Sequence, residues 1–96
     1  MSHFTIKQGV LHAESVALPT IAEKFGTPAY IYSRAALEAA LQEFLDVLSA
    51  HPAGHDALVC YAVKANSNLA ILNLFARMGA GFDIVSGGEL QRVLAA

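Results

Sequence analysis

The chain has 96 residues, a net charge of −2 at neutral pH and apolar side chains at 55% of its positions. It is therefore one domain at most, and the absence of a basic patch argues against a nucleic acid partner. No apolar run is long enough to span a membrane, so we expect no membrane association. A mean hydropathy of +0.47 is high for a small domain, which implies more apolar surface than the chain can bury alone.

Its single cysteine, Cys60, rules out a disulfide within the chain and fits a reducing compartment. The N-terminus has no apolar segment of the kind found in signal peptides, so we predict a cytoplasmic protein. His51 and His55 are four residues apart, but Pro52 and Gly54 break the helix that would align them. No thiol or carboxylate set completes a tetrahedron, and we expect no metal site.

In chain order, residues 4–12 predict a β-hairpin around a Gln8-Gly9 turn. Residues 18–26 predict a short helix that ends at a glycine, and Thr27-Pro28 returns the backbone to an extended state. Residues 29–32 are aromatic and β-branched and predict a short strand. Ser33 is placed to cap a helix over residues 34–49, whose leucines and Phe44 form one apolar stripe.

The second half predicts strand, helix, strand and helix. A continuous apolar run over residues 57–63 is typical of a strand covered on both faces, and residues 68–78 predict a helix with a wide apolar arc. A second strand over residues 82–85 leads to a final helix over residues 90–96, preceded by a Ser-x-x-Glu capping box at Ser86. This spacing predicts an α/β fold with two parallel strands and a right-handed connection.

Lys64 ends the first of these strands, and Asp83 lies near the end of the second. Parallel sheets place chemistry at the carboxyl ends of their strands, so Lys64 is a candidate Schiff-base nucleophile, although a solvated strand-end lysine has the same pattern. Asp83 either holds the lysine ammonium or only terminates its strand. Glu89 is explained without catalysis as the acidic member of the capping box.

Two motifs carry a resemblance to a known family. Tyr-Ala-Val-Lys-Ala-Asn at residues 61–66 and Gly-Phe-Asp-Ile-Val-Ser-Gly-Gly-Glu-Leu at residues 81–90 resemble the amino-terminal part of the diaminopimelate decarboxylase family. These are fold-type III pyridoxal-phosphate enzymes built on an alanine-racemase-like barrel. The lysine and aspartate are nineteen residues apart (83 minus 64). This pairing is more specific than either motif alone.

The resemblance implies that Lys64 binds pyridoxal 5'-phosphate as a Schiff base and that Asp83 and Glu89 receive its ammonium when the substrate displaces it. It implies residues 1–28 as a leading hairpin and short helix, and residues 29–96 as the first part of a (β/α)8 barrel with about two of its strands. The implied reaction is decarboxylation of meso-diaminopimelate to lysine. The resemblance also implies that the intact enzyme is a homodimer.

Such a barrel takes roughly 250 residues, so we expect this chain to be a fragment with little activity alone. Two alternatives remain open. The chain is either a small binding or assembly module that kept the fold without the chemistry, or part of a related ornithine- or arginine-type decarboxylase. The segment Ser86-Gly87-Gly88-Glu89 is closer to the diaminopimelate branch than to these relatives, and residues 67–70 lack the motif expected of alanine racemases.

Overall fold

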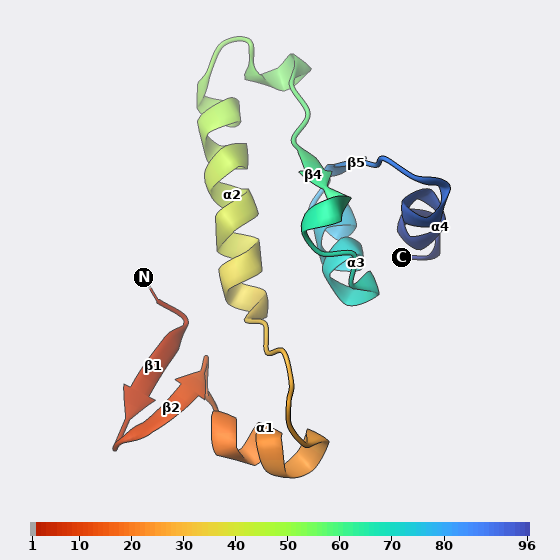
Figure 1. The fold of residues 1–96 in the computed structure, drawn as a ribbon. Coiled ribbons are helices and arrows are strands. Elements are labelled where there is room, and N and C mark those ends of the chain that lie inside the picture. The colour runs from red at the N-terminus through yellow and green to blue at the C-terminus, as the bar shows by residue number, and fades with distance from the viewer. Residues whose placement is uncertain (1) are drawn as a thin grey trace. The chain divides into compact units, whose positions relative to one another are not determined.

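The computed structural model describes residues 2–96, which form strands and helices in the order drawn in Figure 1. The chain divides after Ala39 into two compact units. The elements are β1 (Phe4–Lys7), β2 (Val10–Ala13), β3 (Val16–Ala17), α1 (Leu18–Phe25), α2 (Arg34–Ala50), β4 (Cys60–Ala62), α3 (Leu69–Arg77), β5 (Gly81–Asp83) and α4 (Gly87–Ala95). Two short 3-10 turns, η1 (Gly54–Asp56) and η2 (Val63–Ala65), lie beside β4 in sequence.

The first unit contains the predicted hairpin. Strands β1 and β2 pair antiparallel in a register that sets Lys7 opposite Val10. Gln8 and Gly9 form the turn with φ angles of 51° and 77°, as expected for a two-residue hairpin connection. The predicted helix is also confirmed, since α1 ends at Phe25 and is capped by Gly26 with φ 83°. Strand β3, which extends the sheet beyond β2, was not predicted because two residues are too short to show alternation.

The prediction of a strand over residues 29–32 is wrong, because the backbone there is irregular. A strand needs a neighbour to satisfy its amide and carbonyl groups, and residues 2–96 offer none to this segment. Tyr30 is accordingly 92% exposed. The peptide bond between Thr27 and Pro28, just before this segment, is cis.

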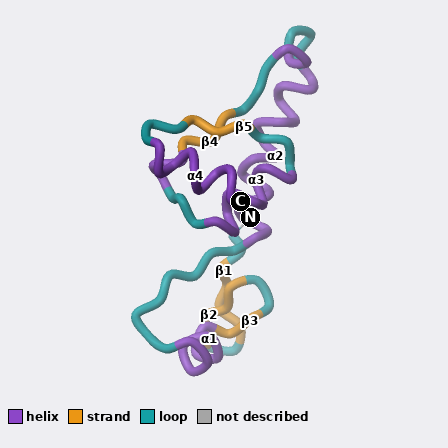
Figure 2. The backbone as a smooth tube through the Cα atoms, turned by 90° about the vertical axis from the view of Figure 1, so that its right-hand side faces the viewer, coloured by secondary structure: helices purple, strands orange, loops and turns teal. Residues whose placement is uncertain are grey.

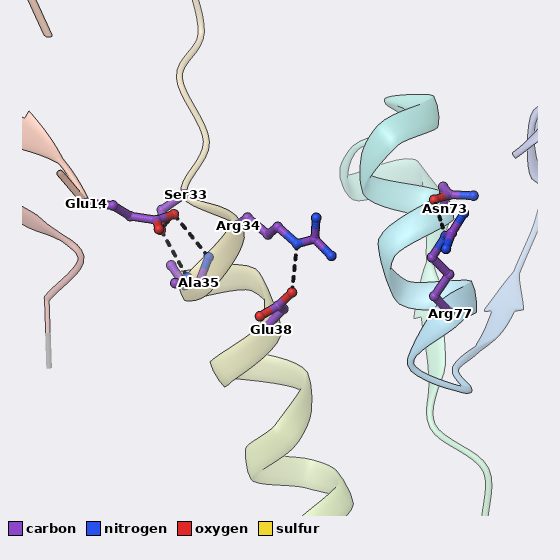
Figure 3. A network of polar contacts seen from close by, with 8 residues as sticks. Glu14, Ser33, Arg34, Ala35, Glu38, Asn73 and Arg77 are labelled. Carbon is purple, nitrogen blue, oxygen red and sulfur yellow. Dashed lines mark hydrogen bonds and ion pairs between the residues drawn. The ribbon is translucent and has the colours of Figure 1, made fainter. Parts of the chain in front are cut away.

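The amino end of α2 is capped twice (Figure 3). Ser33 Oγ accepts a hydrogen bond from the Ala36 amide at 3.0 Å, which confirms the predicted cap. Glu14 adds an acceptor that the sequence did not reveal, since its Oε2 accepts from the Ala35 amide at 3.2 Å and from Ser33 Oγ at 2.9 Å. The Ala35 amide, followed by the Ser33 hydroxyl, lowers the pKa of the Glu14 carboxyl below its ordinary value of 4.5.

The second unit is built on two parallel strands. Figure 2 shows β4 and β5 side by side, and their register pairs Cys60 with Gly81 and Ala62 with Asp83. The prediction of parallel strands joined through a helix is confirmed. Both strands are shorter than predicted, with three residues each, because the backbone pairing between β4 and β5 extends only from Cys60 to Ala62.

Helix α3 supplies most of the core of this unit. Its cap is Asn68, whose side chain accepts from the Ala70 amide at 2.9 Å. The wide apolar arc predicted for this helix is confirmed in part, because four of its nine residues are buried, Ile71, Leu72, Leu74 and Phe75, whereas Leu69 is 42% exposed. Val63, in η2, is as fully buried as Leu72, with no exposed surface. The core therefore lies directly beneath the turn that follows β4.

Much apolar surface stays exposed, as the composition predicted. Phe44 is 63% exposed, although the sequence placed it on the apolar stripe of α2. Val85, at 73%, and Leu94, at 76%, are exposed near the two ends of α4. A monomeric domain rarely exposes so many large apolar side chains without covering them in an assembly or a larger fold.

Candidate cofactor site at the ends of the parallel strands

Lys64 lies in a tight turn immediately after β4. The strand ends at Ala62, and residues 63–65 form the 3-10 turn η2. The sequence predicted that the strand would continue through Val63, and the structure corrects this by one residue. Because the buried Val63 side chain anchors the turn in the core, the next residue is directed away from it. Lys64 is exposed.

Asp83 is the last residue of the neighbouring strand. It stands opposite Ala62 in the β4–β5 register, so Asp83 and Lys64 both lie at the carboxyl edge of the two strands, as predicted. Asp83 is exposed. Within residues 2–96 neither side chain forms a hydrogen bond or an ion pair, so the structure brings a primary amine and a carboxylate to one edge without joining them.

Glu89 is held at the amino end of α4. Ser86 Oγ accepts from the Glu89 amide at 3.1 Å, as the predicted capping box requires. Glu89 Oε1 accepts from the Val85 amide at 2.8 Å, one residue before the Ser86 amide that the capping box predicts. Its carboxylate therefore orders the connection between β5 and α4, and no polar contact joins Glu89 to Lys64 or Asp83 in the described part of the chain.

Two side chains that the sequence did not single out for a site contact the backbone after Lys64. Tyr61, interpreted from sequence as a core residue, donates from its hydroxyl to the Asn66 carbonyl oxygen at 2.9 Å. Arg92 donates from Nε to the Ser67 carbonyl oxygen at 2.8 Å. No sequence signal identified Arg92, because the contact joins residues twenty-five positions apart.

The two histidines considered for metal binding make local contacts instead. His51 Nδ1 accepts from the Ala53 amide at 3.1 Å, and His55 lies 3.3 Å from the Asp56 carboxylate. Across residues 2–96, no three His, Cys, Asp or Glu side chains gather as metal ligands would. The described helices also include none that is long and apolar enough to cross a membrane.

Known proteins similar to this chain are decarboxylases. The chain is 62% identical over all 96 residues to the diaminopimelate decarboxylase of Pseudomonas fluorescens and 59% identical to that of Pseudomonas aeruginosa. It spans 22% of the length of each. The solved structure of diaminopimelate decarboxylase from M. jannaschii in complex with L-lysine superposes with a TM-score of 0.84 at 35% identity, covering 96% of this chain and 22% of that one.

The structural similarity supports the α/β fold class. The strands and helices of this chain superpose on one part of a decarboxylase structure, and the two sequences are 35% identical over that part. Residues 34–96, which include β4, β5 and the candidate site, match the family described as "Pyridoxal-dependent decarboxylase, pyridoxal binding domain". This chain therefore belongs to the pyridoxal-dependent decarboxylases.

Proposed function

We propose that residues 29–96 form the first part of the cofactor barrel of a diaminopimelate decarboxylase, with residues 1–28 as a leading segment. The observation that carries the proposal is the edge formed by Lys64 and Asp83 at the ends of two parallel strands. Relatives of this name match the whole chain at up to 62% identity. The complete protein would convert meso-diaminopimelate to lysine. L-Lysine in the similar M. jannaschii structure supports this choice of product.

The residues present fit pyridoxal 5'-phosphate, whose reactive group is an aldehyde. A primary amine must reach the aldehyde without being held in an ion pair, and Lys64 is exposed and unpaired within residues 2–96. We assign Lys64 as the residue that attaches the cofactor covalently. When bound, the cofactor supplies an electron-accepting ring that takes up the electrons left on the substrate as carbon dioxide leaves.

The two carboxylates have different parts in this proposal. Asp83 is exposed at the strand end and would receive the Lys64 ammonium when the substrate displaces the lysine from the cofactor. Glu89 uses Oε1 to hold the Val85 amide, which leaves Oε2 as a second acceptor for the same ammonium. Both residues would keep the released lysine close to the site, ready for the second exchange that frees the product.

We also propose that the complete enzyme has further barrel strands and a second subunit. The exposed apolar residues Phe44, Val85 and Leu94 are the kind of surface that additional barrel elements or a second subunit would cover. We therefore expect 96 residues alone to show little activity and the complete enzyme to be a homodimer. The unpaired, exposed thiol of Cys60 fits a reducing compartment such as the cytoplasm.

Reductive trapping tests the cofactor assignment. The protein is incubated with pyridoxal phosphate, reduced with borohydride and digested, and the label is located by mass spectrometry. We expect the label on Lys64 and its loss in Lys64→Arg. Lys24→Arg is the matched control, because Lys24 is an exposed lysine on α1, and it should leave the label unchanged. Label spread evenly over the lysines would contradict the proposal and favour a module that has the fold without the chemistry.

Carbon dioxide release tests the substrate. The chain, together with any continuation that its gene encodes, is supplied with meso-diaminopimelate, ornithine or arginine. Release from meso-diaminopimelate alone is expected. Preference for ornithine or arginine would reassign the protein to the related decarboxylases, while robust lysine formation by residues 1–96 in isolation would contradict the expectation that further barrel strands are required.

A further inference from the structure

The turn that carries Lys64 is held from outside at two points. We call residues 63–67 the lysine turn. Tyr61, on β4, donates its hydroxyl to the Asn66 carbonyl oxygen at 2.9 Å. Arg92, on α4, donates Nε to the next carbonyl oxygen, that of Ser67, at 2.8 Å. Consecutive carbonyl groups of the lysine turn are therefore bound by side chains from two different elements.

The Tyr61 hydroxyl is a donor with a fixed position. Its ring packs against Phe75 of α3, with centroids 4.8 Å apart, and meets Phe82 of β5 edge-on at 6.5 Å. Aromatic pairs favour tilted and edge-on arrangements of this kind, and Phe75 is itself buried. The hydrogen bond to Asn66 thus ties the lysine turn to the core of the second unit.

The Arg92 contact ties the same turn to α4. This helix begins after β5 at the Ser86 cap, so Arg92 couples the segment that carries Lys64 to the helix that follows Asp83. The guanidinium is planar and presents its donors in a fixed geometry. One bond through Nε, made by an exposed side chain, therefore links α4 to the Ser67 carbonyl.

Two further bonds at the lysine turn involve Asn66. Inside the turn, the Asn66 amide donates to the Val63 carbonyl at 3.1 Å, and just beyond it the Asn68 amide donates to Asn66 Oδ1 at 3.0 Å. Lys64 is exposed and makes no polar contact within residues 2–96. The direction of its amine therefore depends on the backbone of the turn.

We propose that Tyr61 and Arg92 are positioning residues that hold the lysine turn so that the Lys64 amine is directed at the cofactor aldehyde. This inference rests on the proposed function. Neither residue touches the reacting atoms in the proposal, and each acts through a backbone carbonyl. Loss of either bond should let the turn sample more conformations and reduce the fraction in which the amine is correctly placed.

Amide hydrogen exchange in the cofactor-free protein tests the first half of the proposal. Tyr61→Phe keeps the ring and removes only the hydroxyl, so the core packing is preserved. A hydrogen bond contributes modestly to stability, which predicts exchange of the Asn66 amide about 2- to 10-fold faster than in the unsubstituted protein. Tyr30→Phe is the matched control, because Tyr30 is 92% exposed, and it should change nothing. Unchanged exchange in Tyr61→Phe would overturn the proposal.

The rate of covalent attachment of pyridoxal phosphate to Lys64, followed by absorbance and by borohydride trapping, tests the second half. Attachment should be about 2- to 10-fold slower in Tyr61→Phe and in Arg92→Gln. Arg77→Gln is the control for Arg92, because Arg77 Nε makes a comparable 2.9 Å bond to Asn73 on its own helix (Figure 3). It should attach the cofactor at the unsubstituted rate.

The outcomes separate the two proposals. Faster Asn66 exchange with an unchanged attachment rate would overturn the positioning role while leaving the cofactor assignment intact. Failure of the unsubstituted protein to label Lys64 would overturn the cofactor assignment, and with it the positioning role, before any variant is compared. Slower attachment in both variants, with both controls unchanged, would support the inference.

Discussion

Replacing Val63 by alanine should destabilise the second unit and disturb the site at the same time. Val63 has no exposed surface and precedes Lys64 in η2. The substitution removes two buried carbon atoms, each contributing about 0.8 kcal/mol through transfer from water, and leaves a cavity that adds to the loss. With partial collapse of the cavity, the free energy of unfolding should fall by about 2–3 kcal/mol.

Urea denaturation followed by circular dichroism measures this loss. For a domain of this size the dependence on urea is roughly 1.5 kcal/mol per molar, so the midpoint should fall by about 1.3–2 M. Val85→Ala is the matched control, because it makes the same chemical change at a side chain that is 73% exposed. It should alter the free energy of unfolding by less than about 0.5 kcal/mol.

Equal losses in the two valine variants would refute the reasoning, because they would show that Val63 is not an anchor of the core. If Val63→Ala is destabilised as expected, borohydride trapping under conditions in which the variant stays folded should also show slower labelling of Lys64. Val63 and Lys64 are neighbours in a single turn, so displacement of the buried valine should move the lysine.

Two further predictions concern groups outside the site. Glu14→Gln should lose stability relative to the unsubstituted chain, and this loss should be fully present above pH 4.5 and shrink as the pH falls below that value. The reason is that the Ala35 amide lowers the pKa of the Glu14 carboxyl in the folded state, and protonation removes the stability that the carboxylate contributes. Stability measured from pH 3 to 7 checks this, and a difference between the two proteins that grows on acidification would contradict it. Gly54→Ala should destabilise the chain by about 1–3 kcal/mol in a thermal unfolding assay, because a Cβ at residue 54 would overlap the Leu48 carbonyl oxygen. Gly87→Ala is the control and should be nearly neutral in that assay, because a Cβ at residue 87 meets nothing within 4 Å.

Elements with local signals were predicted well. The Gln8-Gly9 turn needs positive φ angles, and both residues have them. Caps at Ser33 and Ser86 are formed by the side chains expected from sequence. Each of these features depends on residues within four positions of one another, so the chain specifies them before any distant segment is in place.

Features that depend on distant partners were predicted less well. The segment over residues 29–32 has strand-forming side chains but no paired neighbour, and it is irregular. Glu14 caps a helix that begins twenty residues after it. The Glu89 carboxylate binds the Val85 amide, a choice of donor that depends on the path between β5 and α4.

For the candidate site, sequence alone determined which groups are present, a lysine and an aspartate at the ends of two apolar strands, and their spacing, which resembles that of a cofactor-binding family. Only the tertiary structure decided the parallel register that brings Asp83 opposite Ala62, and the contacts of Tyr61 and Arg92 with the lysine turn. The physical reason is that residue types set which reactions are available. The positions of reacting groups depend on hydrogen bonds between segments that meet only after the chain has folded.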